Sequence, residues 1–240
     1  MSETGAYYDH LARFLDLARW VRRDGGAAHA ATHRFLAGHD DDVATPDRLD
    51  RLILDAAREA GLQPSPRVLD AGCGLGGTIF RWHDGVGGHY DGLTLSPEQC
   101  RRAEAEADRR GIGATCRFHV RDYHHRIAGR YNAVIAIESL AHSPDPTGAI
   151  ANLAAALDPG GLFLIVDDMP AGSHDAELLA SFKAHWRCPV LPDAAGFRAA
   201  LSAAGLRVVR EIDLTGRLRP RPRAWLRLLI ATFGMARRLA

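Results

Sequence analysis

The chain has 240 residues, of which 47% are hydrophobic and 25% are charged. A chain of this length and composition can bury a full core, so we expect a globular protein with one α/β domain and an appendage, and neither disorder nor repeats. Its four cysteines are widely separated and form no C-x-x-C pair, which argues against a disulfide framework and a zinc site. The N-terminus lacks a basic segment followed by an apolar stretch, so we expect no secretory signal and a reducing, cytoplasmic setting.

The net charge of +1 hides an asymmetry between the C-terminal tail and the rest of the chain. Residues 216–240 hold seven arginines and no acidic residue, which leaves a charge of −6 on the residues before them. We interpret the tail either as a solvated helix or as a patch for an anionic substrate or a membrane surface. Its apolar run, 224–236, is shorter than the roughly 20 residues of a membrane span. One basic segment does not make the broad basic face of a nucleic-acid-binding protein, so we expect no nucleic-acid partner.

Three helical segments are expected before the first glycine-rich turn. Apolar residues recur at helical spacing between Tyr7 and Val21, and the resulting face needs a partner surface. A second helix is expected over 27–36. Thr45 and Pro46 form a helix start, and the apolar stripe that follows stops at Gly61. We assign residues 1–61 to a helical cap that covers the substrate.

The stretch 67–77, RVLDAGCGLGG, is the most informative part of the sequence. A short apolar run ends in Asp70 and enters a turn with glycines at alternate positions, which is typical of a strand running into a nucleotide-binding turn and a helix N-terminus. The glycine spacing also fits a dinucleotide-binding turn. Asp70 distinguishes the two, because a carboxylate repels a pyrophosphate but suits an ammonium group such as the methionine end of S-adenosylmethionine. The glycines at alternate positions are Gly72, Gly74 and Gly76.

Strands and helices alternate from residue 62 to residue 215, the segment that we assign to the α/β core, with 216–240 as a basic helical tail. This alternation predicts a parallel sheet covered on both faces, with ligands at the carboxyl ends of its strands. Ser96–Gln99 forms a capping box that begins a helix ending near Gly111. The expected strands are 68–70, 89–93, 115–120, 132–137 and 162–167, followed by a sixth at 206–214.

Four strings carry a resemblance to the class I S-adenosylmethionine-dependent methyltransferases: VLDAGCGLG at 68–76, GLTLSPEQ at 92–99, YNAVIAIE at 131–138 and LDPGG at 157–161. The last of these is similar to the family's turn before the fifth strand. The match covers about 64–214. The strings TLSPEQ and ESxxHxPD are most similar to the branch of sterol, tocopherol and cyclopropane-fatty-acid enzymes. The resemblance implies a Rossmann-like fold and S-adenosylmethionine as cofactor. One departure is that the sequence shows no strand after Arg217, so the usual last antiparallel strand is missing or replaced.

The resemblance also implies a set of cofactor-binding residues. Asp70 and the backbone of the turn 72–76, which includes Cys73, are expected to hold the methionine part. An acid that binds the ribose hydroxyls in many relatives is replaced by Thr94, and Thr94, Leu95 and Gln99 are expected to act instead, while the Asp91 side chain points elsewhere. After the third strand, Asp122 is expected to accept the adenine amino group and Tyr123 to lie against the ring; an ordinary polar loop is the alternative.

The same edge of the sheet holds the candidates for methyl transfer. Glu138 and His142 follow the fourth strand, beside the expected position of the sulfonium methyl, and Glu138 is also a candidate cofactor ligand. A hydroxyl or amine acceptor gains from a general base, whereas an alkene leaves a carbocation that needs aromatic faces or carboxylates and then loses a proton. Tyr8, and with it Tyr7, is a candidate to stabilise positive charge; packing is the alternative for these side chains.

The chain has 12 histidines, which raises the question of a metal site. His29 and His33 lie four residues apart without a carboxylate between them, and the His119–His125 segment lacks a metal-binding fold signature, so we expect no metal.

The sequence therefore predicts an enzyme that methylates a small apolar or amphipathic molecule, with carbon preferred over oxygen or nitrogen as acceptor. One alternative is a methyltransferase fold that binds S-adenosylmethionine passively and catalyses a cyclisation or rearrangement. The other is a membrane-associated binding module that acts through the basic tail. An unprotected final strand also makes a homodimer an expectation.

Overall fold

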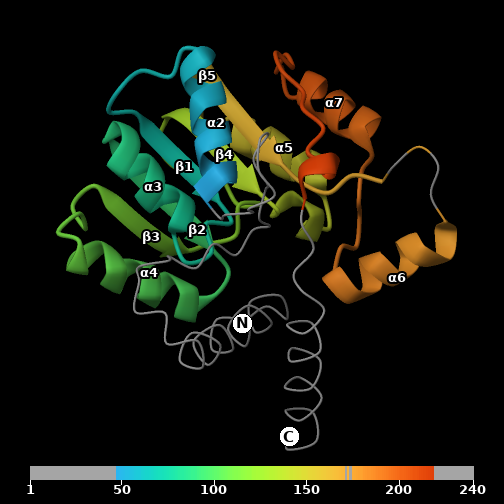
Figure 1. Cartoon of the computed structure of the whole chain (residues 1–240), viewed down its shortest axis with the longest axis horizontal. Helices are drawn as coiled ribbons and strands as arrows, with labels where there is room; N and C mark the ends of the chain where they lie inside the picture. Colours follow the sequence, from blue (N-terminus) through green and yellow to red (C-terminus); the bar gives the residue numbers. More distant parts are fainter. Residues whose placement is uncertain (1–46, 171, 173–174, 219–240) are drawn as a thin grey trace, which may run out of the picture.

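The computed structural model describes residues 47–170, 172 and 175–218 (Figure 1). The expected helices before residue 46, Tyr7 and Tyr8, and the arginine-rich tail from residue 219 onward lie outside the described residues. Their proposed roles stay predictions.

In the described part of the chain, five strands form one sheet in the order β3-β2-β1-β4-β5, and every neighbouring pair is parallel. The order reverses between β1 and β4, because the chain moves outward from β1 to β3 and then crosses to β4. Ligands of open parallel sheets bind at such a reversal, outside the carboxyl ends of the strands. The strands are β1 (Arg67–Ala71), β2 (His89–Thr94), β3 (Cys116–Val120), β4 (Tyr131–Ile137) and β5 (Leu157–Val166).

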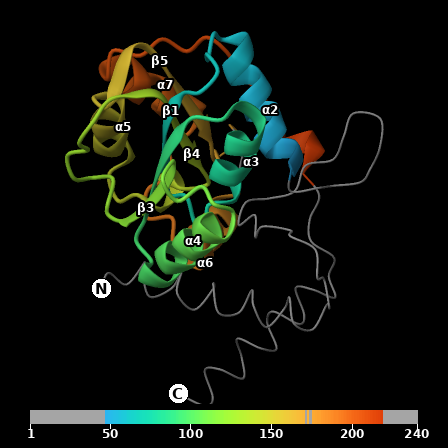
Figure 2. The same cartoon turned by 90° about the vertical axis from the view of Figure 1, so that its left-hand side faces the viewer.

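Helices cover both faces of the sheet, which confirms the predicted fold class (Figure 2). Successive strand residues point to opposite faces, so Val68 belongs to the core on one side and its neighbour Leu69 to the core on the other. The first core is closed by α2 (Asp47–Glu59), α3 (Gly77–Val86) and α4 (Pro97–Arg109), and the second by α5 (Pro146–Ala154) and α7 (Ala194–Ala203).

A polar network inside the first core joins α2 to α3. Asp50 is 1% exposed; its carboxylate accepts a hydrogen bond from Thr78 Oγ1 at 2.7 Å and pairs with Arg81. The indole of Trp82 donates to the backbone carbonyl of Asp50 at 3.2 Å. These bonds satisfy polar groups that would otherwise be costly to bury. They also hold α3 in position, and α3 begins directly after the glycine turn that follows β1.

The start of β5 differs from the prediction. The sequence suggests a turn at 157–161 before a strand, but β5 already begins at Leu157, which pairs with Tyr131. The next pair joins Ala133 to Leu162, so the residues between form a bulge within the strand. Pro159 is tolerated there because β5 lies at the edge of the described sheet.

The sixth strand predicted at 206–214 is wrong: this segment forms no strand. Leu206 packs against the second core and Leu214 against the first, so the chain crosses over the sheet edge instead of running along β5. Arg210 forms an ion pair with Glu59, the last residue of α2, which draws the segment toward that helix. The apolar residues between these two leucines, Val208, Val209 and Ile212, are exposed, so the segment packs on the sheet only near its two ends. The last antiparallel strand does not appear among the described residues.

Helix α6 (Ala176–Trp186) projects from the rest of the domain (Figure 1). None of its residues is buried, and Leu178 and Trp186 are 71% and 47% exposed. No helix in the described ranges is both long enough and apolar enough to cross a membrane.

Candidate functional site

Each of the five parallel strands carries a polar side chain at its carboxyl end or within two residues after it. Because these ends meet at one edge of the sheet, the side chains form a row across it. The sequence predicts all of them except the last as site residues. In sheet order they are Asp122, Thr94, Asp70, Glu138 and Asp167.

The turn after β1 has the backbone that its glycines predict. Gly72, Gly74 and Gly76 have φ angles of 98°, 56° and 80°, a region that favours glycine. A Cβ atom on Gly72 would lie 2.5 Å from Cβ of Ser139, so the turn approaches the end of β4 too closely for any side chain. Ser139 fixes this approach by donating to the carbonyl of Ala71 at 2.6 Å.

The backbone N–H groups of this turn divide into two sets. Those of Gly72 and Cys73 donate to the carbonyl of Leu93 at the end of β2, at 3.0 and 2.9 Å, and hold the turn against the sheet. The N–H groups of Gly74 and Leu75 make no hydrogen bond to any described residue. These two N–H groups and the start of α3 are therefore the backbone donors left for a ligand, and contact of the 72–76 backbone with the methionine part stays a prediction.

Asp70 lies near the end of β1 and is 3% exposed. A carboxylate in such a low-dielectric position favours a cationic partner and disfavours an anionic one. Beside it lie the narrow glycine turn and the N-terminus of α3. The Asp70 carboxylate suits an ammonium group, and the N–H groups of the turn and of the helix N-terminus suit a carboxylate. The residues present are therefore compatible with the methionine part of S-adenosylmethionine, which carries both groups.

The structure brings Thr94 and Gln99 together at the end of β2. Thr94 Oγ1 donates to Gln99 Oε1 at 2.7 Å and accepts from the N–H of Ser96 at 3.1 Å. Ser96 also caps α4 by accepting from the N–H of Gln99, which confirms one half of the predicted capping box. The other half is not formed, because Thr94 and not Gln99 accepts the N–H of Ser96. Thr94 thereby fixes the orientation of the Gln99 amide, while Leu95 between them is half-buried. Their contact with a ribose stays a prediction.

Asp91 does not join this group, as expected. Its carboxylate accepts from Tyr131 Oη at 3.0 Å and lies 3.1 Å from Nε2 of His119, with Arg67 at 3.7 Å. These partners engage it within the sheet, so Asp91 is not the ribose-binding acid of a dinucleotide fold.

The loop after β3 is fastened to the segment after β4. Tyr123 Oη donates to the carbonyl of Ser139 at 2.9 Å, and its ring packs against the second core. Asn152 of α5 donates to the carbonyls of Tyr123 and His125. The loop is therefore rigidly attached, and Asp122 is presented at its start. Stacking of Tyr123 on an adenine and the bond from Asp122 to its amino group stay predictions.

Glu138 has an unusual backbone conformation. Its φ angle is 48°, a region that costs a residue with a Cβ atom about 1–3 kcal/mol and that is often associated with functional sites. Its N–H donates to the carbonyl of Val166 at 2.7 Å, which keeps it in line with the end of β5. The hydrogen bond to β5 holds this strained backbone in place, and the Glu138 side chain is half-buried.

His142 ends the short 3-10 helix η1 (Leu140–His142). Burial lowers its pKa, although the backbone carbonyl of Arg187, 3.4 Å from Nδ1, and the charge of Asp168 act in the opposite direction. The imidazole is therefore neutral near pH 7 and can accept a proton. The structure thus gives the predicted candidate a protonation state suited to a base.

Asp167 is a residue that the sequence reasoning missed. It follows β5 directly; one carboxyl oxygen accepts from the N–H of Ala141 in η1 and the other from the N–H of Asp168, both at 3.0 Å. Burial raises its pKa to about 7; the two N–H groups oppose this, and the charges of Asp168 and Glu138 add to it. The sequence could have indicated Asp167, because this carboxylate directly follows an apolar run, as Asp70 does.

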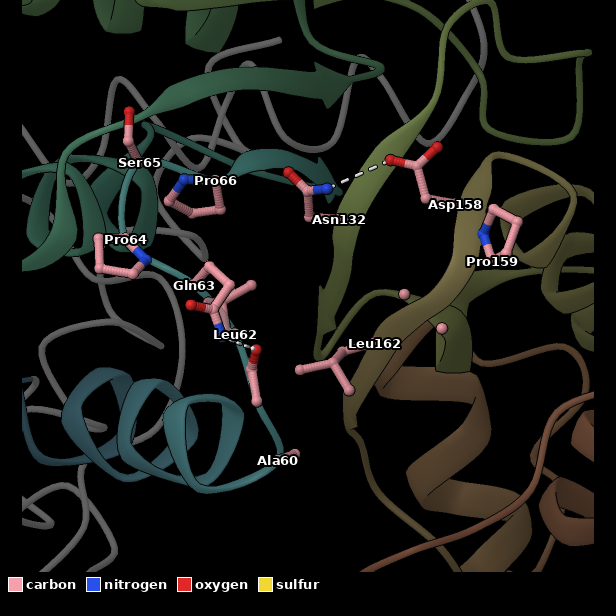
Figure 3. Close-up of a pocket in the computed structure, with 13 residues that line it drawn as sticks. Ala60, Leu62, Gln63, Pro64, Ser65, Pro66, Asn132, Asp158, Pro159 and Leu162 are labelled. Atoms are coloured by element: carbon pink, nitrogen blue, oxygen red, sulfur yellow. Dashed lines mark hydrogen bonds between the residues drawn. The ribbon is translucent and has the colours of Figure 1, made fainter.

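The polar row at the carboxyl ends of the strands contains no metal-binding cluster, and the pocket described below lies elsewhere. Within the described residues, no group of three histidine, cysteine or acidic side chains is arranged to hold a metal ion. A pocket lies at the opposite edge, between segment 60–66 and the bulge of β5 (Figure 3). There Asn132 donates to Asp158 at 3.2 Å. This pocket is formed at the amino ends of β1, β4 and β5, away from the row of polar side chains.

Comparison with known sequences agrees with the geometry. A family model described as "Methyltransferase domain" matches residues 40–211. An O-methyltransferase of Aspergillus nomiae is 28% identical, over 74% of this chain and 82% of its own length. A cycloartenol-C-24-methyltransferase of Oryza sativa subsp. japonica is 30% identical, over 67% of this chain and 46% of its own. The chain therefore spans most of the first relative and less than half of the second.

Solved structures show the same fold. The geranyl diphosphate C-methyltransferase of Streptomyces coelicolor, in complex with Mg²⁺, geranyl diphosphate and S-adenosyl-L-homocysteine, superposes with a TM-score of 0.70 at 18% identity, covering 88% of this chain and 83% of that one. The cyclase SpnF superposes with a TM-score of 0.70 at 24% identity, covering 90% and 75%. At these identities the similarity shows the fold alone.

Proposed function

The chain belongs to the S-adenosylmethionine-dependent methyltransferases, and we propose that it methylates a carbon atom of a small apolar or amphipathic molecule, such as an isoprenoid or another natural-product intermediate. The observation that carries the proposal is the combination of two carboxyl groups, Glu138 and Asp167, with the neutral imidazole of His142 at the ends of β4 and β5.

Bound S-adenosylmethionine supplies a methyl group on a positively charged sulfur, so the chain's own residues mainly need to align the acceptor and exclude water. Glu138 adds negative charge at this place, and Asp167, whose pKa is about 7, adds to it in its ionised form. Positive charge that develops on an alkene carbon when a methyl group is added is stabilised by such carboxylates. His142, which is neutral, then accepts the proton that restores the double bond.

The same charges argue against an oxygen acceptor. A carboxylate close to a hydroxyl group raises the pKa of that hydroxyl, because it disfavours a second negative charge. An enzyme that must form an oxyanion gains from cationic neighbours instead. The relatives support both chemistries by name, since one is an O-methyltransferase and the other a C-24-methyltransferase. The electrostatics of the β4 and β5 ends therefore favour carbon.

A second candidate keeps the fold and changes the reaction. The cyclase SpnF shares this fold, and a cyclisation on it would leave the methyl group of bound S-adenosylmethionine in place. Formation of S-adenosylhomocysteine separates the two, since only methyl transfer produces it. The third reading, a membrane-associated module, depends on the tail; vesicle sedimentation with and without residues 216–240 tests it.

The test uses S-adenosylmethionine carrying carbon-13 in its methyl group and pairs of matched acceptors. One pair is an unsaturated isoprenoid alcohol and its hydrogenated form; the other is a phenol and its methyl ether. We expect label in the product of the unsaturated alcohol and none in the saturated one, with a chemical shift typical of a methyl group on carbon. The variants Glu138→Gln and His142→Gln should lower the rate of labelling by about 100-fold each.

Label found only on the oxygen of the phenol or the alcohol would overturn carbon methylation while preserving the methyltransferase. Conversion of an acceptor without label and without S-adenosylhomocysteine would instead support the cyclisation. Equal activity of both variants and the wild type would remove Glu138 and His142 from the reaction.

A further inference from the structure

A chain of hydrogen bonds joins the loop after β3 to the segment after η1. The carboxylate oxygen Oδ1 of Asp122 accepts from the backbone N–H of His124 at 2.9 Å and lies 2.6 Å from its ring nitrogen Nδ1. The other ring nitrogen, Nε2, lies 2.8 Å from Oγ of Ser143. Residues far apart in sequence are thereby connected through a single imidazole.

The partners fix where the protons lie. A carboxylate only accepts, so Nδ1 of His124 carries the hydrogen that it donates to Asp122. In the neutral ring Nε2 is then an acceptor and takes the hydroxyl hydrogen of Ser143. Ser143 Oγ in turn accepts the backbone N–H of Asp145 at 3.0 Å. Every group in this network is satisfied in one tautomer, and such networks hold their members rigidly.

The network leaves the two oxygens of Asp122 in different situations. Both bonds from His124 end on Oδ1, and no other described residue bonds to Oδ2. Burial raises the pKa of this carboxyl, but the hydrogen bonds from the backbone and ring of His124, together with the charges of His124 and His125, outweigh it, so the pKa lies below its usual value. Asp122 is therefore an ionised acceptor with one oxygen fixed by the protein and the other directed elsewhere.

We propose that His124 is a positioning residue, which holds Asp122 so that its second oxygen accepts the amino group of the cofactor's adenine ring. The inference rests on the cofactor site assigned to this edge of the sheet, and it adds a residue whose role the sequence does not indicate. Ser143 anchors the imidazole to the segment that begins with η1, so the adenine-binding loop and the candidate base His142 are held in one rigid unit.

The order of carboxylate, imidazole and hydroxyl also occurs in serine hydrolases, where the hydroxyl is a nucleophile. Ser143 is 1% exposed and already accepts a backbone hydrogen bond, so no substrate can reach it. Its burial favours the anchoring role.

The test is calorimetric titration with S-adenosylhomocysteine and with S-inosylhomocysteine, which has a carbonyl oxygen in place of the adenine amino group. The wild type should prefer the adenine compound by about tenfold or more, since a hydrogen bond to a charged acceptor is lost and two oxygens then face each other. His124→Gln keeps a group near Nε2 but none near Nδ1, and should reduce this preference at least threefold. His124→Asn keeps a donor near Nδ1 and should retain it.

His125→Gln is the matched control, because this exposed neighbour forms no side-chain hydrogen bond with Asp122 and contributes least to lowering the pKa of Asp122, so the preference should stay within about twofold. A mere loss of folding would weaken both ligands together and would not change the ratio. An unchanged ratio in His124→Gln would overturn the positioning role, and an unchanged ratio in Asp122→Asn would overturn the adenine contact itself. Failure of the wild type to bind either compound would overturn the cofactor site, whereas the carbon-methylation proposal is decided separately by the labelling experiment.

Discussion

A Cβ atom built on Gly72 lies 2.5 Å from the Cβ atom of Ser139, so the turn after β1 and the end of β4 meet without room for a side chain. This contact brings the glycine turn and the candidate catalytic segment into one site. Gly72 is needed for two reasons: its φ angle is positive, and Ser139 leaves no space for a Cβ atom.

Gly72→Ala should therefore be more harmful than an alanine at a glycine of equal backbone conformation. Gly61 is the matched control: its φ angle is 101°, against 98° for Gly72, but no atom lies within 4 Å of its Cβ position. We expect Gly72→Ala to lower the free energy of unfolding in urea by about 1–3 kcal/mol more than Gly61→Ala does. Adding Ser139→Gly should recover part of the loss; equal losses at the two glycines would contradict the close contact.

Glu138 should reveal its backbone strain in a comparison of alanine and glycine. Both variants lose the carboxylate, but only glycine relieves the positive φ angle, so Glu138→Gly should be at least as stable as Glu138→Ala. The same pair at Val209, which is 63% exposed and has no positive φ angle, should show the opposite order, by about 0.5–1 kcal/mol. Thermal unfolding measures both pairs; lower stability of Glu138→Gly than of Glu138→Ala would mean that no strain is stored there.

Asp167 should make stability depend on pH. Its folded-state pKa of about 7 lies above the value of an unfolded aspartate, so the folded protein binds the proton more tightly. The stabilisation is complete below about pH 4 and is lost as the pH rises toward 7. In urea titrations between pH 5 and pH 8, we expect the wild type to lose more stability than Asp167→Asn does. Parallel pH profiles for the two proteins would refute the raised pKa.

Thr94 should affect stability and cofactor binding by holding the side chain of Gln99. Thr94→Val removes a hydroxyl that donates to Gln99 and accepts from Ser96, whereas Thr94→Ser keeps both bonds. Valine should cost about 1–3 kcal/mol of unfolding free energy because buried partners lose their bonds. It should also weaken S-adenosylhomocysteine binding more than serine does. Equal binding by the two variants would leave Thr94 with a structural role only.

The sequence could predict the features that depend on local residue types. The five strands and the helices between them follow from apolar runs and turn residues, and the turn at 72–76 follows from glycines that the backbone requires. The row of polar residues at the carboxyl ends follows from the parallel arrangement, because each strand brings the residues at or just after its carboxyl end to the same edge. These inferences need no knowledge of side-chain packing.

The features that failed or were missed depend on contacts between distant residues. The 206–214 segment has a strand-like pattern, but Leu206 and Leu214 pack on opposite faces of the sheet. The positioning role proposed for His124 depends on Ser143, which is distant in sequence but lies 2.8 Å from the imidazole in the fold. The raised pKa of Asp167 arises from burial, which a sequence does not state.

We predict that Asp70 recognises the ammonium group of the cofactor's amino-acid tail, and the assignment of the cofactor site depends on this contact. Calorimetry with wild type and Asp70→Asn tests it, using S-adenosylhomocysteine and methylthioadenosine, which lacks that tail. We predict that the substitution weakens S-adenosylhomocysteine by about tenfold or more and methylthioadenosine by less than about twofold. Equal weakening of both ligands, or none of either, would contradict the account.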